Sequence, residues 1–315
     1  MENKIEKIYK IEINNKEYPK QLLRLKNPPK ELYAIGNISL LQKKIVAIVG
    51  SRKCSNYGIE YAKKFATALS KNNITIVSGL AEGIDTIAHK YSMKNKGRTI
   101  AVLASGFEHI FPKENKQLFN EIIKNNGCII SEYPPETNVN MKNFPIRNRI
   151  IAALSEGLLV IEAKHRSGST ITARDALKLE IPVFCLPNKL GEVNGVGTNN
   201  LIKKGAYLVT TVNDILEKIG EELLDENRII EIYKTIDELD KEKERENKLY
   251  KPINVDNQYM EIYQTLIEKP LNIEELARKT NKCIAEINQK ITIMEIEGLI
   301  ETCPGNIIKL KNINF

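Results

Sequence analysis

The chain has 315 residues, of which 42% are hydrophobic, and this is enough for one large domain and a small one. Trp is absent and aromatic residues make up 6%, so the sequence offers few platforms for base stacking. Lys and Arg number 47 against 40 for Asp and Glu, a net charge of +7. This excess fits a polyanionic partner, and it fits equally well a general bias of composition toward Lys and Asn.

The residues that report on compartment and on metals are few and scattered. The five cysteines form no CxxC pair, which is typical of reduced thiols in the cytoplasm. No signal-peptide segment and no membrane-spanning apolar run is evident. The three histidines lack metal-ligand spacing. We therefore expect a cytoplasmic protein with no membrane segment, no metal and no cofactor.

Along the chain, a mixed lead-in over residues 1–42 precedes a regular alternation of elements. The apolar run 45–49 ends at Gly50 and predicts a buried parallel strand. Further strands are expected at 74–77, 99–103, 128–130, 158–161 and 183–186, and helices at 57–71, 84–95, 116–124 and 171–179. This alternation predicts an α/β class, with a doubly wound, mostly parallel Rossmann-like sheet over residues 43–220.

The remaining residues divide into a charged stretch and a small unit. Residues 221–254 include the run 240–246 and are expected to be a solvated helix or linker. Residues 255–315 show three helical segments and a hairpin around Pro304-Gly305-Asn306, which predicts a winged-helix domain. Its third helix, 284–297, is acidic and poorly suited to the major groove. We expect this domain to bind proteins or to regulate.

Several loops that follow strands are suited to binding an anion. Gly50-Ser51-Arg52 combines a tight turn with a hydroxyl and a guanidinium that can hold a phosphate. In the next loop, Gly79, Ala81 and Gly83 would let backbone amides approach a ligand at a helix N-terminus. Because parallel strands end at one edge of a sheet, these loops are expected to lie together. Asp85 is expected to cap the helix rather than bind a ligand.

The segment 144–155 holds two arginines and an asparagine just before an apolar run. Arg147 and Arg149 are expected to hold phosphates together with Asn148, because an alternative internal role would need two separate acidic partners. For Phe144 two interpretations stay open, stacking on a base and packing in the core.

The loop after the strand at 158–161 could supply another anion contact. Lys164 and Ser169 are candidates, and the alternative is a capped helix with exposed bases. His165 has no partner spacing that indicates a hydrolytic triad. Glu132 and Glu162 lie at separate strand ends, which favours structural roles over a catalytic pair. The candidates for DNA binding are Ser51, Arg52, Gly79, Ala81, Gly83, Phe144, Arg147, Asn148, Arg149, Lys164 and Ser169.

In this order the motifs resemble the DNA-processing protein A family, also called DprA or Smf. The resemblance is dense over residues 18–219 and is carried most specifically by Phe144-Pro145-Ile146-Arg147-Asn148-Arg149-Ile150-Ile151. It implies a non-enzymatic protein that binds single-stranded DNA without sequence preference, protects incoming strands in natural transformation and helps load RecA recombinase. It also implies a homodimer, with phosphate contacts at Arg52, the loop 79–83 and residues 147–149. Two departures are a lead-in shorter than the helical domain of many members, and Asn188 where the family has Gly.

Two other functions compete with that interpretation. A nucleoside-monophosphate phosphoribohydrolase would share a related fold, but the corresponding residues 166–170 read Arg-Ser-Gly-Ser-Thr and lack that family's signature and its glutamate. A duplex-binding transcription regulator would act through the winged helix, against which the acidic third helix argues.

Overall fold

The computed structural model describes residues 7–94, 98–249, 256, 258–268, 270–297, 299–303 and 306–310. The chain divides into two compact units, Met1–Ile236 and Asp237–Phe315. Within the described ranges, no helix is both long enough and apolar enough to cross a lipid bilayer.

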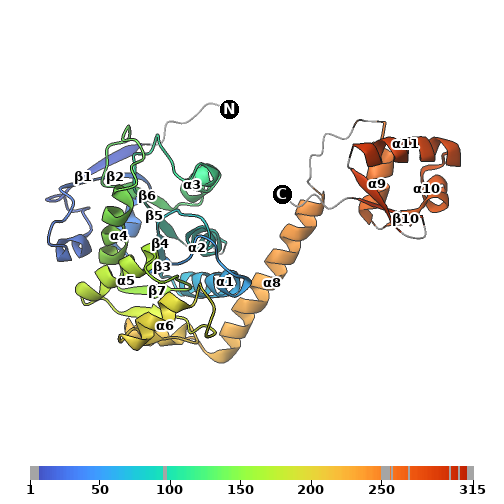
Figure 1. Cartoon of the computed structure of the whole chain (residues 1–315). Helices are drawn as coiled ribbons and strands as arrows, with labels where there is room; N and C mark the ends of the chain where they lie inside the picture. The colour runs from blue at the N-terminus through green and yellow to red at the C-terminus, as the bar shows by residue number, and fades with distance from the viewer. Residues whose placement is uncertain are drawn as a thin grey trace. The chain divides into compact units, whose positions relative to one another are not determined.

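A nine-stranded sheet forms the centre of the first unit (Figure 1). Its order is β1-β2-β6-β5-β4-β3-β7-β8-β9, and the seven strands from β6 to β9 are parallel. The strands are β1 (Ile8–Glu12), β2 (Glu31–Gly36), β3 (Ile45–Val49), β4 (Thr75–Ser78), β5 (Thr99–Leu103), β6 (Cys128–Ser131), β7 (Gly157–Val160), β8 (Val183–Cys185) and β9 (Tyr207–Leu208). The prediction of a doubly wound, mostly parallel Rossmann-like sheet is confirmed.

The lead-in is part of this sheet rather than a separate segment. Strands β1 and β2 pair with each other, and β2 pairs with β6, in antiparallel fashion, so they extend one edge. Tyr18, in the loop between them, is buried and donates a hydrogen bond from its hydroxyl to the carbonyl of Pro29 at 2.8 Å. The first unit therefore starts before residue 43, the expected start of the domain.

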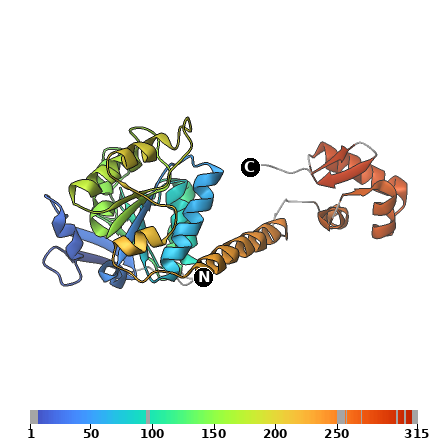
Figure 2. The ribbon, with the colours of Figure 1, turned by 90° about the horizontal axis from the view of Figure 1, so that it is seen from below.

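Helices cover both faces of the sheet (Figures 1 and 2). Val46 and Ile48 of β3 point to one face, whereas Ile45, Ala47 and Val49 point to the other, as strand geometry requires. The first face carries α1 (Asn56–Lys71), α2 (Ile84–Met93), α3 (Lys116–Lys124) and α7 (Asn213–Lys218). The second face carries η1 (Lys20–Arg24), η2 (Ile38–Gln42), α4 (Asn143–Leu154), α5 (Gly168–Lys178) and α6 (Val196–Lys203). A short helix, η3 (Lys113–Asn115), directly precedes α3.

Helix α4 was not among the elements expected from the sequence. Its C-terminal half, Ile150–Leu154, is buried on all sides, so it lacks the alternation of apolar and polar residues that identifies a surface helix. Pro145 falls in its first turn, where proline is tolerated. Arg147 and Arg149 therefore project from a helix packed against the sheet.

The charged stretch 221–254 is less solvated than expected. Helix α8 (Glu226–Leu249) begins on the first unit, where Leu224, Ile232 and Ile236 are buried in the core. Apolar residues one helical turn apart fix this first part of α8 in place. The expected boundary between residues 254 and 255 lies outside the described residues.

The second unit has the winged-helix pattern predicted from the sequence. It contains α9 (Met260–Glu268), β10 (Leu271–Asn272), α10 (Ile273–Thr280), α11 (Ile284–Ile296), β11 (Ile300–Cys303) and β12 (Ile307–Leu310), with strand order β10-β12-β11. A capping box between Asn272 and Glu275 starts α10. Of the expected turn, Pro304 and Gly305 lie outside the described residues.

Candidate functional site

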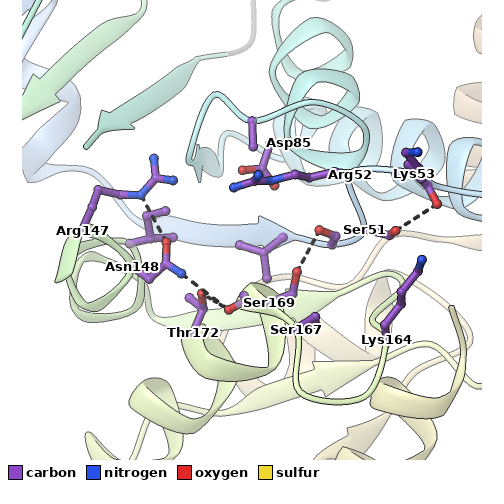
Figure 3. A pocket seen from close by; sticks show the side chains of 15 residues that line it. Ser51, Arg52, Lys53, Asp85, Arg147, Asn148, Lys164, Ser167, Ser169 and Thr172 are labelled. Carbon is purple, nitrogen blue, oxygen red and sulfur yellow. Dashed lines mark hydrogen bonds between the residues drawn. The ribbon is translucent and has the colours of Figure 1, made fainter. Parts of the chain in front are cut away.

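A pocket of about 420 Å³ opens at the carboxyl ends of β3 and β7 (Figure 3). Strand β3 lies at the centre of the sheet between β4 and β7. The strands that follow β3 in the chain are added on one side of it, and those from β7 onward on the other. Such a reversal of strand order separates the loops that follow the two strands and opens a crevice for ligands. We call it the switch-point pocket. It brings together seven of the eleven candidate residues: Ser51, Arg52, Ala81, Arg147, Asn148, Lys164 and Ser169.

Three cationic side chains of the switch-point pocket are exposed to solvent. Arg52 and Lys53 follow β3, and Lys164 follows β7. Within the part of the chain that the structure describes, none of the three forms an ion pair. Figure 3 shows Lys53 and Lys164 at one end of the pocket and Arg52 beside Asp85. Lys53 was missed in the sequence, although its position next to Arg52 at a strand end could have indicated it.

The two candidate serines hold the loop after β3 in place. Ser51 Oγ donates to the carbonyl of Lys53 at 2.9 Å, and Ser169 Oγ donates to the carbonyl of Gly50 at 2.8 Å. Asn194 Nδ2 adds a hydrogen bond to the Lys53 carbonyl at 2.8 Å. A hydroxyl has a single proton to donate, and in both serines it is already used within the protein. Ser51 and Ser169 therefore position Arg52 and Lys53.

Arg147 is buried and its donors are used within the fold. Its side chain is 4% exposed. Nη1 donates to the carbonyls of Gly79, at 2.6 Å, and Val102, and Nε donates to Asn148 Oδ1 at 3.2 Å. Burial lowers the pKa of the guanidinium to about 10, while the charge of Asp85 opposes that shift. Arg147 thus ties α4 to the loop after β4 and to β5.

Asp85 does not cap α2 as expected. It lies within the first turn, after the N-cap residue Gly83, and its Oδ2 accepts a hydrogen bond from Gly79 N at 3.1 Å. Burial raises the pKa of the carboxyl, and the charge of Arg147 counteracts this. Asp85 and Arg147 therefore hold the N–H and the C=O of the same glycine.

The loop 78–83 presents fewer free amides than the sequence suggested. Gly79 N is bound by Asp85, and Leu80 N donates to His89 Nε2 at 3.3 Å. Thr99 Oγ1 donates to the carbonyl of Ile76, so it accepts from His89 Nδ1 at 2.7 Å. His89 is therefore neutral, and burial lowers its pKa to about 3. The expectation that this loop offers an anion its amides is wrong for these two residues.

Two glycines of this loop are required by close packing. Gly83 has φ +73°, and a Cβ there would overlap the carbonyl oxygens of Ser51 and Arg52. A Cβ on Gly79 would lie 2.7 Å from the guanidinium of Arg147. The glycines thus bring the loops after β3 and β4 together.

Arg149 lies outside the switch-point pocket. Its Nη2 contacts both carboxylate oxygens of Glu132, at 2.5 and 2.7 Å, and Nη1 donates to the Asn27 carbonyl at 3.1 Å. Contrary to expectation, both arginines have internal roles: Arg149 binds Glu132, whereas Arg147 donates to backbone carbonyls and its charge is opposed by that of the buried Asp85. The carboxylate of Glu162, the other acid considered, accepts from Ser55 N at 3.0 Å and from Ser55 Oγ at 2.5 Å.

A smaller aromatic pocket of about 90 Å³ adjoins the first. It is lined by Phe111, Pro112, Phe144, Gly79 and Glu82, and it shares Arg52 and Ala81 with the switch-point pocket. The rings of Phe111 and Phe144 meet edge to face, with centroids 5.7 Å apart, and the Arg52 guanidinium lies 5.8 Å from the Phe144 centroid. Phe144 is half-buried at a pocket wall rather than in the core. Phe111, 39% exposed, was not a candidate.

Comparisons with known proteins agree with these features. The family model of DNA recombination-mediator protein A matches residues 10–220, and that of the DprA winged helix domain matches residues 251–306. The DNA processing protein DprA of Bacillus subtilis is 42% identical over 67% of this chain and 71% of its own. Protein Smf of Escherichia coli is 34% identical over 93% of this chain and 75% of its own.

Two solved structures share the fold. That of DNA processing protein A from Streptococcus pneumoniae has a TM-score of 0.64 and 40% identity, over 69% of this chain and 76% of its own. That of DNA processing protein A from Helicobacter pylori, described for its single-stranded DNA binding mode, has a TM-score of 0.62 and 34% identity, over 68% and 96%. On these matches, the chain belongs to the DprA/Smf family of DNA recombination-mediator proteins.

Proposed function

We propose that this protein binds single-stranded DNA, without sequence preference, at the switch-point pocket and the aromatic pocket. The carrying observation is the set of exposed cations, Arg52, Lys53 and Lys164, around a pocket whose other polar side chains form hydrogen bonds within the protein. Cationic side chains that contact phosphates release counterions and read no sequence. The aromatic pocket beside Arg52 is lined by two rings, Phe111 and Phe144, that a base can contact. The structure of the Helicobacter pylori relative, described for its single-stranded DNA binding mode, supports a single strand as the ligand.

The eleven candidate residues and Lys53 then have different roles. Arg52, Lys53 and Lys164 contact phosphates, and Phe144 contacts a base. Arg147 positions the loop after β4 and adds a positive charge behind Arg52. The other residues, Ser51, Gly79, Ala81, Gly83, Asn148 and Ser169, form the pocket walls or fix their loops, and Arg149 fastens α4 to Glu132.

In the cell, we infer, a cytoplasmic homodimer of this protein protects incoming strands and helps load RecA recombinase in natural transformation or recombination. Membership in the recombination-mediator family supports this role. A non-enzymatic protein fits the switch-point pocket, because Asp85 is the one carboxylate among its described lining residues and is buried against Gly79. The other carboxylate of the proposed site, Glu82, is exposed and lines the aromatic pocket. The alternative, a nucleoside-monophosphate phosphoribohydrolase, would need an acid placed to act on the glycosidic bond.

The test is the binding of a fluorescent single strand and a matched duplex at several salt concentrations. We expect Arg52→Ala to weaken single-strand binding about tenfold for all sequences and to lower the salt slope by about 0.7. Arg98→Ala is the matched control. This exposed arginine directly precedes β5, so it lies at the amino ends of the parallel strands, whereas the pocket lies at their carboxyl ends.

Equal binding by wild type and Arg52→Ala would remove Arg52 from the site. Preference for the duplex would contradict the proposed function. Release of free base from nucleoside monophosphates would establish the hydrolase alternative instead.

A further inference from the structure

The loop between β8 and α6, residues 186–195, contacts both of the loops that carry the exposed cations of the switch-point pocket. The side chain of Asn194 reaches the loop after β3, where its Nδ2 donates to the carbonyl of Lys53 at 2.8 Å. The backbone carbonyl of Asn194 reaches the loop after β7, where it accepts from Ala163 N at 2.7 Å. Ala163 directly precedes Lys164. A single residue therefore joins the two loops beside their lysines.

The backbone around Asn194 is itself held in place. Gly197 N donates to the carbonyl of Ala163 at 2.7 Å, so both backbone groups of Ala163 are bound by this part of the chain. A Cβ on Gly197 would lie 2.5 Å from that carbonyl oxygen, which explains the glycine. At the other end of the loop, the hydroxyl of Tyr57 donates to the carbonyl of Pro187 at 2.8 Å. The loop is thus fastened at both ends, and this sets the position of the Asn194 side chain.

A second contact joins the same two loops deeper in the fold. Glu162 is 1% exposed, and its carboxylate binds both the N–H and the hydroxyl of Ser55, the N-cap residue of α1. A Cβ on Gly58 would overlap this carboxylate, so the glycine lets it approach the start of α1, where a negative charge is favourable. Ser55 lies two residues after Lys53, and Glu162 lies two residues before Lys164. The two loops are therefore joined on both sides of the lysines.

We propose that Asn194 is a positioning residue of the single-strand site, which holds Lys53 and Lys164 at a fixed spacing so that one strand contacts both. This inference rests on the proposed function and assigns part of its affinity to a residue that is not among those lining the pocket. Loops that must be ordered during binding reduce affinity, and a contact that orders them beforehand removes this cost. Because the Asn194 side chain is uncharged, it raises affinity without adding a phosphate contact.

The experiment is a double-mutant cycle in the full chain, read out by the binding of a fluorescent oligothymidylate of about 20 nucleotides. We expect Asn194→Ala to weaken binding about fivefold with an unchanged salt slope, because every cation is still present. In a Lys164→Ala background the same substitution should change the affinity by less than about twofold. There the spacing between the two lysines no longer matters, and Ser51 Oγ still holds the Lys53 carbonyl at 2.9 Å.

The matched control is Asn188→Ala. It removes the same type of side chain, also half-buried, from the same loop, where Asn188 Oδ1 accepts from Lys189 N at 2.8 Å. This variant should bind the strand as wild type does in both backgrounds.

Three results would overturn the proposal. They are unchanged binding by Asn194→Ala, a loss as large in Asn188→Ala, and a loss that is equal with and without Lys164. The last result would show that Asn194 acts on folding or assembly in general rather than on the spacing of the lysines. Failure of the proposed function differs from all three, because Arg52→Ala and Lys164→Ala would then bind the strand as tightly as wild type.

Discussion

Arg52 and Arg147 line the same pocket and both lie near the ring of Phe144, yet they differ in burial and in hydrogen bonding. Arg52 lies on the loop after β3, is exposed, and contacts the ring of Phe144. Arg147 projects from α4, is 4% exposed, and donates to two backbone carbonyls. A buried guanidinium has lost its water and is retained by the partners that replace it, whereas an exposed one keeps its donors for a ligand.

This difference shows that arginines at one pocket can have two roles: some hold the fold together, and others remain exposed to a ligand. The segment 144–149 is the most specific motif of the chain, but both its arginines bind within the protein. The exposed cations come from shorter and less distinctive loops. Positive charge at the pocket therefore comes from the buried Arg147, which holds the loops in place, and from the exposed Arg52, Lys53 and Lys164, whose charges are open to a ligand.

The largest expected effect comes from replacing the inner arginine. Arg147→Met should lower the free energy of unfolding by about 3–5 kcal/mol, because it leaves the buried Asp85 carboxylate without its opposing charge. It also leaves the carbonyls of Gly79 and Val102 without their donor. Urea unfolding measures the change. For comparison, Arg52→Ala should alter stability by no more than about 0.5 kcal/mol while it weakens DNA binding. Similar stability losses in both variants would remove the distinction.

A second effect concerns the histidine behind the loop. In the fold His89 has a pKa of about 3 against an ordinary value of 6.5, so between these values the unfolded chain binds a proton that the folded chain does not. Stability is therefore fully present above pH 6.5 and is lost as the pH falls toward 3, by up to about 1.4 kcal/mol per pH unit.

The variant His89→Gln should lack this contribution. Urea unfolding at pH 7, 6 and 5 should show the stability advantage of wild type shrinking as the pH falls. His109 and His165 are present in both proteins, so the difference between them isolates His89. If the stabilities of wild type and His89→Gln changed equally with pH, His89 would titrate normally. Its hydrogen bonds to Leu80 and Thr99 would then be open to water.

The smallest effect is expected from removing the winged-helix unit. A chain ending at Lys248 keeps the whole first unit, including the buried start of α8, the switch-point pocket and the aromatic pocket. Single-strand affinity and salt slope should stay within about twofold of the full chain, because no phosphate contact is lost. A folded truncation that no longer binds single-stranded DNA would place the site in the second unit. It would then contradict the role proposed for Arg52.

Much of the architecture could be predicted from local patterns. The short, mainly apolar runs identified the parallel strands, because strands buried on both faces have few polar positions. Helix α4 was missed because it is buried around its C-terminal half, where the periodic signal vanishes. Strands β1 and β2 were missed because their pairing with each other and with β6 is decided by distant residues.

For the site, the sequence determined the place and the chemistry. Strand ends of a doubly wound sheet converge by topology, so Arg52 and Lys164 could be assigned to one edge from the sequence alone. Only the tertiary structure decided which cations are free. Arg147 binds Gly79, 68 positions away, and Arg149 binds Glu132, 17 positions away, and contacts over such distances depend on how the elements pack. Residue type sets what a side chain can bind, whereas burial and neighbours decide what it does bind.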